Sequence, residues 1–340
     1  MACSGPCWFQ LTVCSVFHIP GLLKNMAMEM RAQGTRGGSV WALACVLMAS
    51  LAHSAMAQCS PAESDALLKF KSFFSDPRND FASWTGGNCC SWKGVQCSGS
   101  GVTGINLDFG APSRGGPGAP SLLIWSDPEA SFKAGEALSH LYQLQVLHTN
   151  WIIWNAPLPV RKFANLPLRE IVVRNGFLGN ANAAGGALGN DIGLFANSLE
   201  VLILQNTKYN IGLPSDLCKL KKLRVLEVSE SHLPNVGPAC LGSALNNTLQ
   251  EVRVHSNYKI TTGLPVWPTL LPYLKVLDFS NNAHSGNIPV QYGKLANVEL
   301  HLGGNHLTGK LPSGLSALPE SAFRPGNEKL CGAPLSTCPA

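Results

Sequence analysis

An apolar pattern that returns at near-regular intervals constrains the fold of this chain most. Its clearest copy is LPYLKVLDFSNNAHSGNIPVQYGK at residues 271–294. The middle apolar residues of successive copies are Ile105, Leu147, Ile171, Leu202, Leu226, Val252, Leu277 and Leu300. The steps between them are 42, 24, 31, 24, 26, 25 and 23 residues. A short apolar strand cannot bury its own edge, so the copies are expected to stack into a solenoid.

The length of the period predicts the kind of solenoid. Repeats of roughly 20–29 residues with leucines at these positions are leucine-rich repeats. The expected fold class is an α/β repeat solenoid: a right-handed superhelix of leucine-rich repeats with a concave parallel β-sheet and disulfide-bonded N- and C-terminal caps. Such a fold offers an extended binding surface rather than a catalytic pocket.

The same pattern predicts the domain organisation. We expect a leader with a secretory signal peptide at 1–57, an N-terminal cap at 58–100, about eight repeats at 101–318 and a C-terminal cap at 319–340. The two long steps place insertions near 110–137 and 176–194. Solenoids accept additions outside the sheet, so these are expected to be surface loops, and a ligand-contacting island is the alternative.

The leader has the order of an exported chain. Arg31 and Arg36 precede the apolar run SVWALACVLMASL, and small residues then favour cleavage after Ala57. A signal anchor is the alternative, although the apolar run is short for a bilayer. A long stretch of the chain precedes the signal peptide itself. This favours a translation start downstream of Met1 over a genuine longer leader. The candidate starts are Met26, Met28 and Met30.

Composition excludes several function classes. The 340 residues are 45% hydrophobic and 13% charged, which excludes a disordered chain. The net charge is +5, and removing the leader leaves 22 basic against 19 acidic side chains. No lysine- or arginine-rich run occurs, so neither nucleic acid nor an anionic membrane is an expected partner. No stretch after the leader has the length of a membrane span, so none is expected in the mature chain.

Cysteine usage is consistent with export. Four of the 12 cysteines lie in the leader, and the other eight are Cys59, Cys89, Cys90, Cys97, Cys218, Cys240, Cys331 and Cys338. An even number in an oxidising compartment indicates four disulfides. No CxxC pair occurs, so neither a metal site nor a cofactor is expected. A bridge between neighbouring loops, Cys218 to Cys240, is favoured over two buried thiols.

An amphipathic helix is predicted directly after the leader. Ser60-Pro61-Ala62-Glu63 is a capping box with proline at the first helical position. Leu67, Phe70 and Phe74 follow at helical spacing, and Asp76-Pro77 is expected to end the helix. The aromatic residues beyond it are expected to cover the first turn of the solenoid, because an open end would expose core leucines and a strand edge.

The two ends of the chain carry a family resemblance. The strings CSPAESDALLKFKSFF, FASWTGGNCCSWKGVQC and KLCGAPLSTC resemble the caps of plant-type extracellular leucine-rich-repeat proteins. GNIP at 286–289 and GKLP at 309–312 are similar to the plant subtype. Polygalacturonase-inhibiting proteins and the ectodomains of receptor-like proteins share this layout. The resemblance implies disulfides Cys59–Cys89, Cys90–Cys97 and Cys331–Cys338, although the C-terminal cap has fewer cysteines than the inhibitors carry.

Recognition is expected on the strand residues that alternate with the leucines, because these point outward. The predicted ligand-binding residues are His148, Asn150, Trp151, Arg174, Phe177, Ile203, Glu227, Arg253, His255 and Asp278. Exposed aromatics beside arginine are typical of a binding hot spot. The alternative for Trp151 and Trp154 is packing under the first insertion.

Other polar residues have separate expectations. Asn257, Asn282 and Asn305 follow the strands and are expected to hydrogen-bond the backbone where it turns. Glu227, Arg253 and Asp278 occupy equivalent positions and form either a charge ladder or a polar contact strip. Asn246 begins the sequon Asn-Asn-Thr, a predicted glycosylation site.

The predicted function is recognition, without enzyme activity. No nucleophile elbow, opposed carboxylate pair or other catalytic string occurs. We expect a secreted protein, extracellular or in the cell wall, that binds an extracellular protein, peptide or cell-wall polysaccharide. The resemblance implies defence or signalling, including inhibition of a wall-degrading enzyme. The alternative is a receptor-like ectodomain or co-receptor that acts with a receptor kinase at the plasma membrane.

Overall fold

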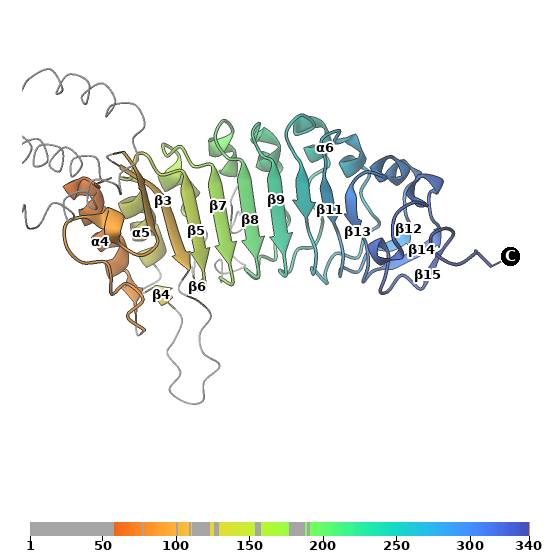
Figure 1. The fold of residues 1–340 in the computed structure, drawn as a ribbon, viewed down its shortest axis with the longest axis horizontal. Coiled ribbons are helices and arrows are strands. Elements are labelled where there is room, and N and C mark those ends of the chain that lie inside the picture. The colour runs from red at the N-terminus through yellow and green to blue at the C-terminus, as the bar shows by residue number, and fades with distance from the viewer. Residues whose placement is uncertain are drawn as a thin grey trace, which may run out of the picture. The chain divides into compact units, whose positions relative to one another are not determined.

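A nine-stranded sheet organises the protein. The computed structural model describes residues 58–76, 78–99, 101–108, 110, 123–125, 129–153, 158–176, 188 and 191–339. The strands are β2 (Val95–Ser98), β3 (Gly101–Asp108), β5 (Val146–Asn150), β7 (Glu170–Arg174), β8 (Val201–Gln205), β9 (Val225–Ser229), β10 (Glu251–Arg253), β11 (Val276–Asp278) and β13 (Glu299–His301). They lie side by side in sequence order (Figure 1), all parallel from β3 to β13, and β2 pairs antiparallel with β3.

The predicted register is confirmed in every strand pair. Ile105 pairs with Leu147, Leu147 with Ile171, and Ile171 with Leu202. The series continues through the pairs of Leu226, Val252, Leu277 and Leu300. All eight of these residues are 4% exposed or less. The expected repeat fold is therefore correct, because one apolar residue from each strand stacks on the next inside the solenoid.

Short helices return the chain from the end of one strand to the start of the next. They are the 3-10 helices η3 (Val160–Phe163), η4 (Ile192–Phe195), η5 (Ser215–Lys219), η6 (Trp267–Leu270), η7 (Val290–Leu295) and η8 (Ser313–Leu315), with α6 (Leu241–Ala244) between η5 and η6. Each buries one or two apolar side chains, such as Phe163, Phe195 and Leu217, against the back of the sheet. The core therefore lies between the sheet and these helices.

Buried asparagines hold the backbone where it leaves the strands. The side chain of Asn282 donates to the carbonyls of Val254 (2.7 Å) and Phe279 (2.9 Å). Its Oδ1 accepts from the backbone N–H of Asn257 at 2.7 Å. Asn257 and Asn305 make equivalent contacts one turn before and one turn after. The predicted structural role of the three asparagines is correct.

The asparagine ladder changes along the chain. Asn327, which the sequence reading missed, extends it into the C-terminal cap and donates to the carbonyls of Leu302 and Phe323. In the other direction the equivalent positions hold Ser231 and Thr207, whose hydroxyls lie 3.2 Å apart. A hydroxyl reaches fewer backbone groups than an amide does, so the turns become less regular toward the N-terminus.

The N-terminal cap begins with α4 (Pro61–Ser72). Its capping box forms as predicted: Ser60 Oγ accepts from the Glu63 N–H, and Glu63 Oε2 accepts from the Ser60 N–H. Glu63 Oε1 also accepts from the N–H of Val102 in β3, at 2.8 Å. One buried carboxylate therefore joins the cap helix to the first strand of the solenoid.

The predicted end of this helix was wrong. The helix stops at Ser72, and Phe74 lies in β1 (Phe74–Ser75), which pairs antiparallel with β4 (Leu123–Trp125). β4 also pairs parallel with β6 (Ile152–Ile153), the segment after β5. The helical spacing of Phe74 was misleading, because Phe74 pairs as a strand residue with β4, which is distant in the sequence.

The first insertion is not simply a surface loop. Besides β4 it contains α5 (Ala130–Leu138), whose Ala130, Ala134 and Leu138 are fully buried. α5 contacts α4 and η3, so the part nearest β5 completes the N-terminal core. Residues 111–122 and most of the second insertion lie outside the described residues, as does the leader through residue 57.

Aromatic side chains fill the N-terminal cap as predicted. Phe70, Phe81 and Trp84 are no more than 1% exposed, and Trp84 stacks on Trp92 with ring centroids 5.4 Å apart. Each indole N–H has a partner, Trp84 on the carbonyl of Lys93 and Trp92 on that of Thr85. The rings therefore cover the leucines of the first turn without leaving an indole N–H unpaired.

Four disulfides join the cysteines after the leader. Cys59–Cys89 and Cys90–Cys97, with the 3-10 helix η2 (Cys89–Ser91) between them, close the N-terminal cap. Cys218–Cys240 connects the loops of two neighbouring repeats, and Cys331–Cys338 closes the C-terminal cap. These pairs match those expected from the resemblance and from the positions of Cys218 and Cys240.

The C-terminal end carries a second parallel sheet. Its strands are β12 (Ser285–Asn287), β14 (His306–Lys310) and β15 (Lys329–Cys331), seen at the C-terminal end of Figure 1. The 3-10 helix η9 (Glu320–Ala322) lies beside β13, and Ala322 accepts a hydrogen bond from the N–H of Leu302. This contact satisfies a backbone group that the last repeat would otherwise expose. None of the helices in the described part of the chain combines the length and apolarity that a membrane crossing needs.

Replacing a ladder asparagine should destabilise the fold. For Asn282→Ala we expect the free energy of unfolding to fall by about 2–4 kcal/mol, because two carbonyls and one N–H lose their buried partner. Urea unfolding measures the change. The control is Asn297→Ala, at an exposed position. Equal effects of the two substitutions would contradict the structural role of the ladder.

His284 should make stability depend on pH. Its ring is fully buried, and Nδ1 donates to the carbonyl of Thr262 at 2.7 Å. Burial lowers the pKa of His284 below its usual 6.5. The folded state favours the neutral form of His284. The stability that this neutral ring contributes is therefore complete above pH 6.5, and it is lost as the pH falls from there through the lower folded-state pKa.

The measurement is urea unfolding at neutral and mildly acidic pH. We expect His284→Gln to remove part of the loss of stability on acidification, whereas the exposed His140→Gln should leave the pH dependence of wild type intact. If both variants keep the same pH dependence as wild type, His284 is not responsible.

Candidate recognition face

The outward face of the sheet is the candidate functional site. We call it the open face and define it by the first, third and fifth residues of each repeat strand and the residue that follows them. Its central row is set by the strand register: Asn106, His148, Val172, Ile203, Glu227, Arg253, Asp278 and His301. Because leucines occupy the alternate positions, these side chains can differ from turn to turn without changing the core.

Apolar and polar side chains are mixed on the open face from β5 to β9, where Glu170 lies in the same row between Val146 and Val201. Val146, Val201, Ile203 and Val225 are partly exposed there. His148 Nε2 lies 3.0 Å from Glu170 Oε2, which joins β5 to β7 across the surface. Val172, which the sequence pattern placed among the outward residues, is only 3% exposed. It contributes packing rather than accessible surface.

The part nearest the C-terminal cap is charged, but the charge ladder does not form. Arg253 pairs with Glu251 on its own strand and with neither Glu227 nor Asp278 on the adjacent strands. Glu227 instead accepts from Ser229 Oγ at 2.7 Å. Asp278 accepts from Ser280 Oγ at 2.6 Å. Among the described residues, therefore, each of these carboxylates is held by a serine two positions later and by no cation.

Hydrogen-bonded rows of side chains follow the edge where the strands end. Arg174 Nε donates to Gln205 Oε1 at 3.2 Å, and Gln205 Nε2 donates to Glu230 Oε1 at 2.8 Å. A parallel row joins Asn150, Asn175 and Asn206 at 3.0 and 2.9 Å. The sequence analysis identified Asn150 and Arg174 but missed these rows, although a polar residue after each strand was a visible signal.

A left-handed residue ends each repeat strand from β5 onward. These residues are Trp151, Asn175, Asn206, Glu230, Ser256, Asn281 and Gly304, with φ between 49° and 68°. Glycine and asparagine adopt this conformation most easily, whereas a bulky side chain is an outlier there. Trp151, at φ 61°, is therefore held in a conformation that costs roughly 1–2 kcal/mol.

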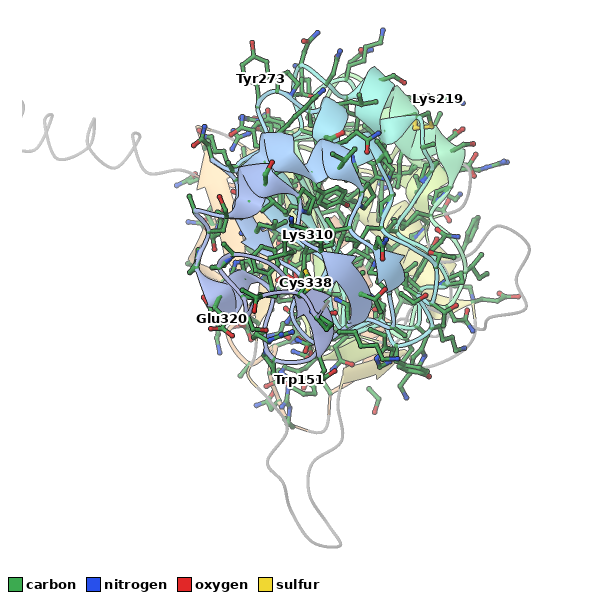
Figure 2. All side chains as sticks on the ribbon, turned by 90° about the vertical axis from the view of Figure 1, so that its right-hand side faces the viewer. Trp151, Lys219, Tyr273, Lys310, Glu320 and Cys338 are labelled. Atoms are coloured by element: carbon green, nitrogen blue, oxygen red, sulfur yellow. A yellow bond between two sulfur atoms is a disulfide. The ribbon has the colours of Figure 1, made fainter. Side chains whose placement is uncertain are left out.

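The structure places Trp151 at the rim of the open face. It is partly exposed, and its N–H donates to the carbonyl of Arg174 at 3.0 Å. It lies at the opposite edge of the molecule from Tyr273 (Figure 2). His255, also partly exposed, contacts Ser256 Oγ through Nδ1 at 3.1 Å. Phe177 and Trp154 lie outside the described residues.

The open face is acidic although the chain is not. Its carboxylates are Asp108, Glu170, Glu227, Glu230, Glu251, Asp278 and Glu299. Its cations are Arg174 and Arg253. The whole chain has a net charge of +5, so charge is segregated and the face carries a negative potential.

Basic residues gather at the opposite edge, where the strands begin. A shallow recess of about 310 Å³ there is lined by Glu200, Lys222, Arg224, Asn247, Thr248 and Gln250. Glu200 accepts from Arg169 Nε at 2.8 Å, and this hydrogen bond lowers the pKa of the Glu200 carboxyl below 4.5. The exposed Asn246 of the sequon precedes the residues of this recess.

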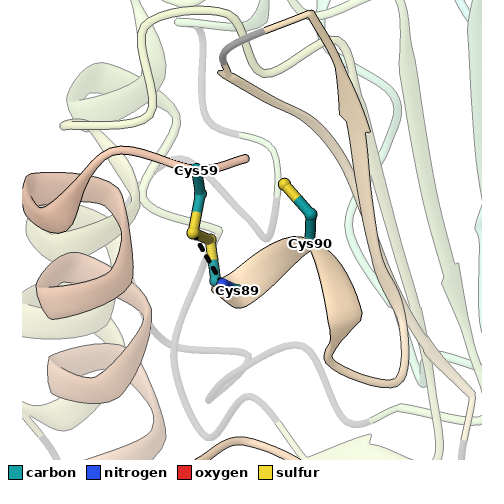
Figure 3. Close-up of side chains that lie close together, drawn as sticks. All are labelled: Cys59, Cys89 and Cys90. Carbon is teal, nitrogen blue, oxygen red and sulfur yellow. Dashed lines mark hydrogen bonds between the residues drawn. A yellow bond between two sulfur atoms is a disulfide. The ribbon is translucent and has the colours of Figure 1, made fainter. Parts of the chain in front are cut away.

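Three cysteine sulfurs in the N-terminal cap lie within 4.8 Å of one another: those of Cys59, Cys89 and Cys90 (Figure 3). Cys59 is bonded to Cys89, and Cys90 is bonded to Cys97. A disulfide sulfur is not a thiolate, which is the form of cysteine that binds metal ions. The cluster therefore stabilises the cap and offers no metal ligands.

Comparison with known families agrees with this architecture. The leucine rich repeat N-terminal domain matches residues 60–98, and a leucine rich repeat matches residues 298–318. The first segment contains the capping helix and the Cys90–Cys97 disulfide, and the second contains the last repeat strand. The two matches bracket the solenoid.

Curated relatives include receptor-like proteins of Arabidopsis thaliana. The chain is 26% identical to receptor-like protein 41 over 261 residues, covering 75% of this chain and 26% of that protein. It is 32% identical to receptor-like protein 43 over 123 residues, covering 36% of this chain and 16% of that protein. The chain thus spans at most about a quarter of the length of these relatives.

Solved structures share the fold. The ectodomain of the Arabidopsis receptor kinase HAESA, in complex with an N-terminal extended IDA peptide hormone, aligns with a TM-score of 0.57 and 23% identity, over 75% of this chain and 39% of that one. A plant ice-binding protein aligns with a TM-score of 0.51 and 18% identity, over 83% of this chain and 99% of that one. With its continuous repeat register and the two family matches, the chain has a leucine-rich-repeat fold and is similar to receptor-like proteins of Arabidopsis thaliana.

Proposed function

We propose that this protein recognises an extracellular protein or peptide through the open face. The observation that carries the proposal is the contrast between the two sides of each strand. The inward residues repeat from turn to turn, whereas the outward residues form a varied, partly exposed surface with an apolar part, an acidic part and a strained rim tryptophan. A surface of this kind fits binding better than catalysis, because no nucleophile and base meet within a cleft in the described part of the chain.

The relatives support a role in signalling or defence. HAESA, which has the same fold, is described in complex with a peptide hormone and also with the co-receptor SERK1. We propose by analogy that a peptide or a receptor kinase is a partner of this chain. Because the fold alone is shared, the open face of this chain and not that of HAESA must determine the ligand.

Export and modification complete the proposal. The chain would be secreted after cleavage at Ala57 and glycosylated at Asn246, which is exposed. It would act in the extracellular space or the cell wall. A narrower form of the proposal is inhibition of a wall-degrading enzyme such as a polygalacturonase, and cell-wall polysaccharide is a further candidate ligand. A receptor-like ectodomain at the plasma membrane is the second candidate, supported by the receptor-like relatives.

The location of the expressed protein separates these two roles. For a secreted protein we expect the mature chain, beginning at Gln58, in the medium and wall fractions of expressing cells. Immunoblotting after cell fractionation, with N-terminal sequencing of the recovered chain, makes the measurement. Recovery solely in the membrane pellet would favour the receptor-like role.

Trp151 should matter for binding more than for stability. In Trp151→Asn the new residue matches the asparagines at the equivalent position of neighbouring turns, so we expect the free energy of unfolding not to fall. Partner affinity should fall about tenfold or more, as for other aromatic residues that act as binding hot spots. Affinity is measured by calorimetry with a partner recovered from wall extract, after testing polygalacturonase inhibition as the first assay.

The control places the same residue at the same position of another turn. Ser256→Asn has the starting φ of 56° and lies on the rim beyond β10. We expect it to leave affinity unchanged. Loss of stability with intact binding in Trp151→Asn would mean that the tryptophan is structural.

A further inference from the structure

The open face has two parts with different chemistry, and this division identifies the class of segment that it fits. The apolar part is Val201, Ile203 and Val225, on the adjacent strands β8 and β9. The acidic part is Glu227, Glu230, Asp278 and Glu299, on or just after β9, β11 and β13. No protein segment covers either part within the described residues. The inference below rests on the proposed function and specifies its ligand.

Two carboxylates of the acidic part, those of Glu227 and Asp278, are held in a fixed orientation in which each could contact a cation of a ligand. Glu227 Oε1 accepts a hydrogen bond from Ser229 Oγ, and Asp278 Oδ1 accepts hydrogen bonds from the N–H and Oγ of Ser280. In the described part of the chain the second oxygen of each carboxylate has no partner. The serines restrict the side chains to one orientation, so less rotamer entropy is lost when a partner binds.

The residue between them limits which cation pattern can bind. Arg253 lies in the same row, directly between Glu227 and Asp278, and is paired with Glu251. A ligand that places a positive charge over Arg253 is repelled by the guanidinium, whereas one that places a neutral residue there is not. The row therefore fits a ligand that places a positive charge over Glu227, a neutral residue over Arg253 and a second positive charge over Asp278.

The spacing of the two carboxylates matches an extended polypeptide. They are two strands apart, which is about 9.5 Å. In polyproline II conformation, residues i and i+3 lie on the same side of the chain and about 9.3 Å apart. Two basic residues separated by two neutral ones can therefore reach both carboxylates while the chain crosses the strands.

We propose that the open face binds an extended polypeptide segment with apolar residues at one end and a pair of basic residues, lysine or arginine at i and i+3, at the other. The apolar residues of the segment contact Val201, Ile203 and Val225 on β8 and β9. The basic residues contact Glu227 and Asp278. The acidic face supplies the charge complementarity, and the segregation of charge from the rest of the molecule speeds encounter with a basic ligand.

Synthetic peptides test the proposal with the full secreted chain. The first probe is an alternating valine–serine segment followed by Lys-Ser-Ser-Lys. The second has the same composition with adjacent lysines, and the third replaces both lysines by glutamate. We expect binding of the first by fluorescence anisotropy, weaker binding of the second and none of the third. Equal binding of the first two would overturn the proposed spacing, and binding of the third would overturn the charge assignment.

Variants locate the contact on the face. Glu227→Gln and Asp278→Asn should each weaken the first peptide about fivefold and reduce its salt dependence. The matched control is Asp65→Asn with Glu136→Gln, which removes two exposed carboxylates on α4 and α5, away from the open face. The control should bind like wild type. Equal weakening by both sets would mean attraction by net charge alone and would overturn the site.

The outcome is distinguishable from a failure of the proposed function. If a natural partner is lost in Trp151→Asn yet binds equally to the Glu227 and Asp278 variants, the open face recognises a ligand of different chemistry, such as a neutral cell-wall polysaccharide. If the partner is indifferent to all of these substitutions, the open face itself is not the site.

Discussion

The apolar column inside the sheet is the interaction on which the rest of the structure depends. Eight strands each contribute one buried residue at the same register position, from Ile105 to Leu300. Each member packs on its neighbours, so no single repeat is stable alone, and the two ends need covers. The aromatic cap, Glu63 with its bond to β3, and the contact of Leu302 with η9 all follow from that need. Once the column is formed, most of the alternate positions are not needed for core packing and are available for recognition.

Backbone polarity is the second requirement, and the protein meets it in two ways. From Asn257 to Asn327, buried amides bond the carbonyls and N–H groups of adjacent turns. Toward the N-terminus this ladder weakens through Ser231 and Thr207, and at β5 the equivalent position is Ile152, part of β6. There the small sheet β1–β4–β6 bonds the backbone instead. The first insertion thus replaces part of a missing ladder, which explains why it could enter the repeat without opening the core.

Electrostatics and strain distinguish the open face from the remainder of the surface. A chain with an overall positive charge concentrates seven carboxylates on one face, and within the described residues neither Glu227 nor Asp278 is paired with a cation. Trp151 occupies a left-handed position that asparagine would occupy at lower cost. The left-handed conformation of Trp151 costs free energy, and a cluster of like charges is repulsive. Both are therefore better explained by binding than by folding, which is the basis of the proposed function.

The repeat register, the capping box and the structural role of three asparagines could be predicted from the sequence, because each depends on residues close in the chain or on a strict period. The sequence could not predict that Phe74 leaves its helix for β4, that Val172 is buried, or that Arg253 pairs along its own strand, because these depend on partners brought together by folding. For the same reason the outward positions were predictable as a set, whereas the separate apolar and acidic parts of the open face emerged only from the tertiary structure. Period and local hydrogen bonding are encoded within one turn, but a surface is made by the alignment of side chains from many turns.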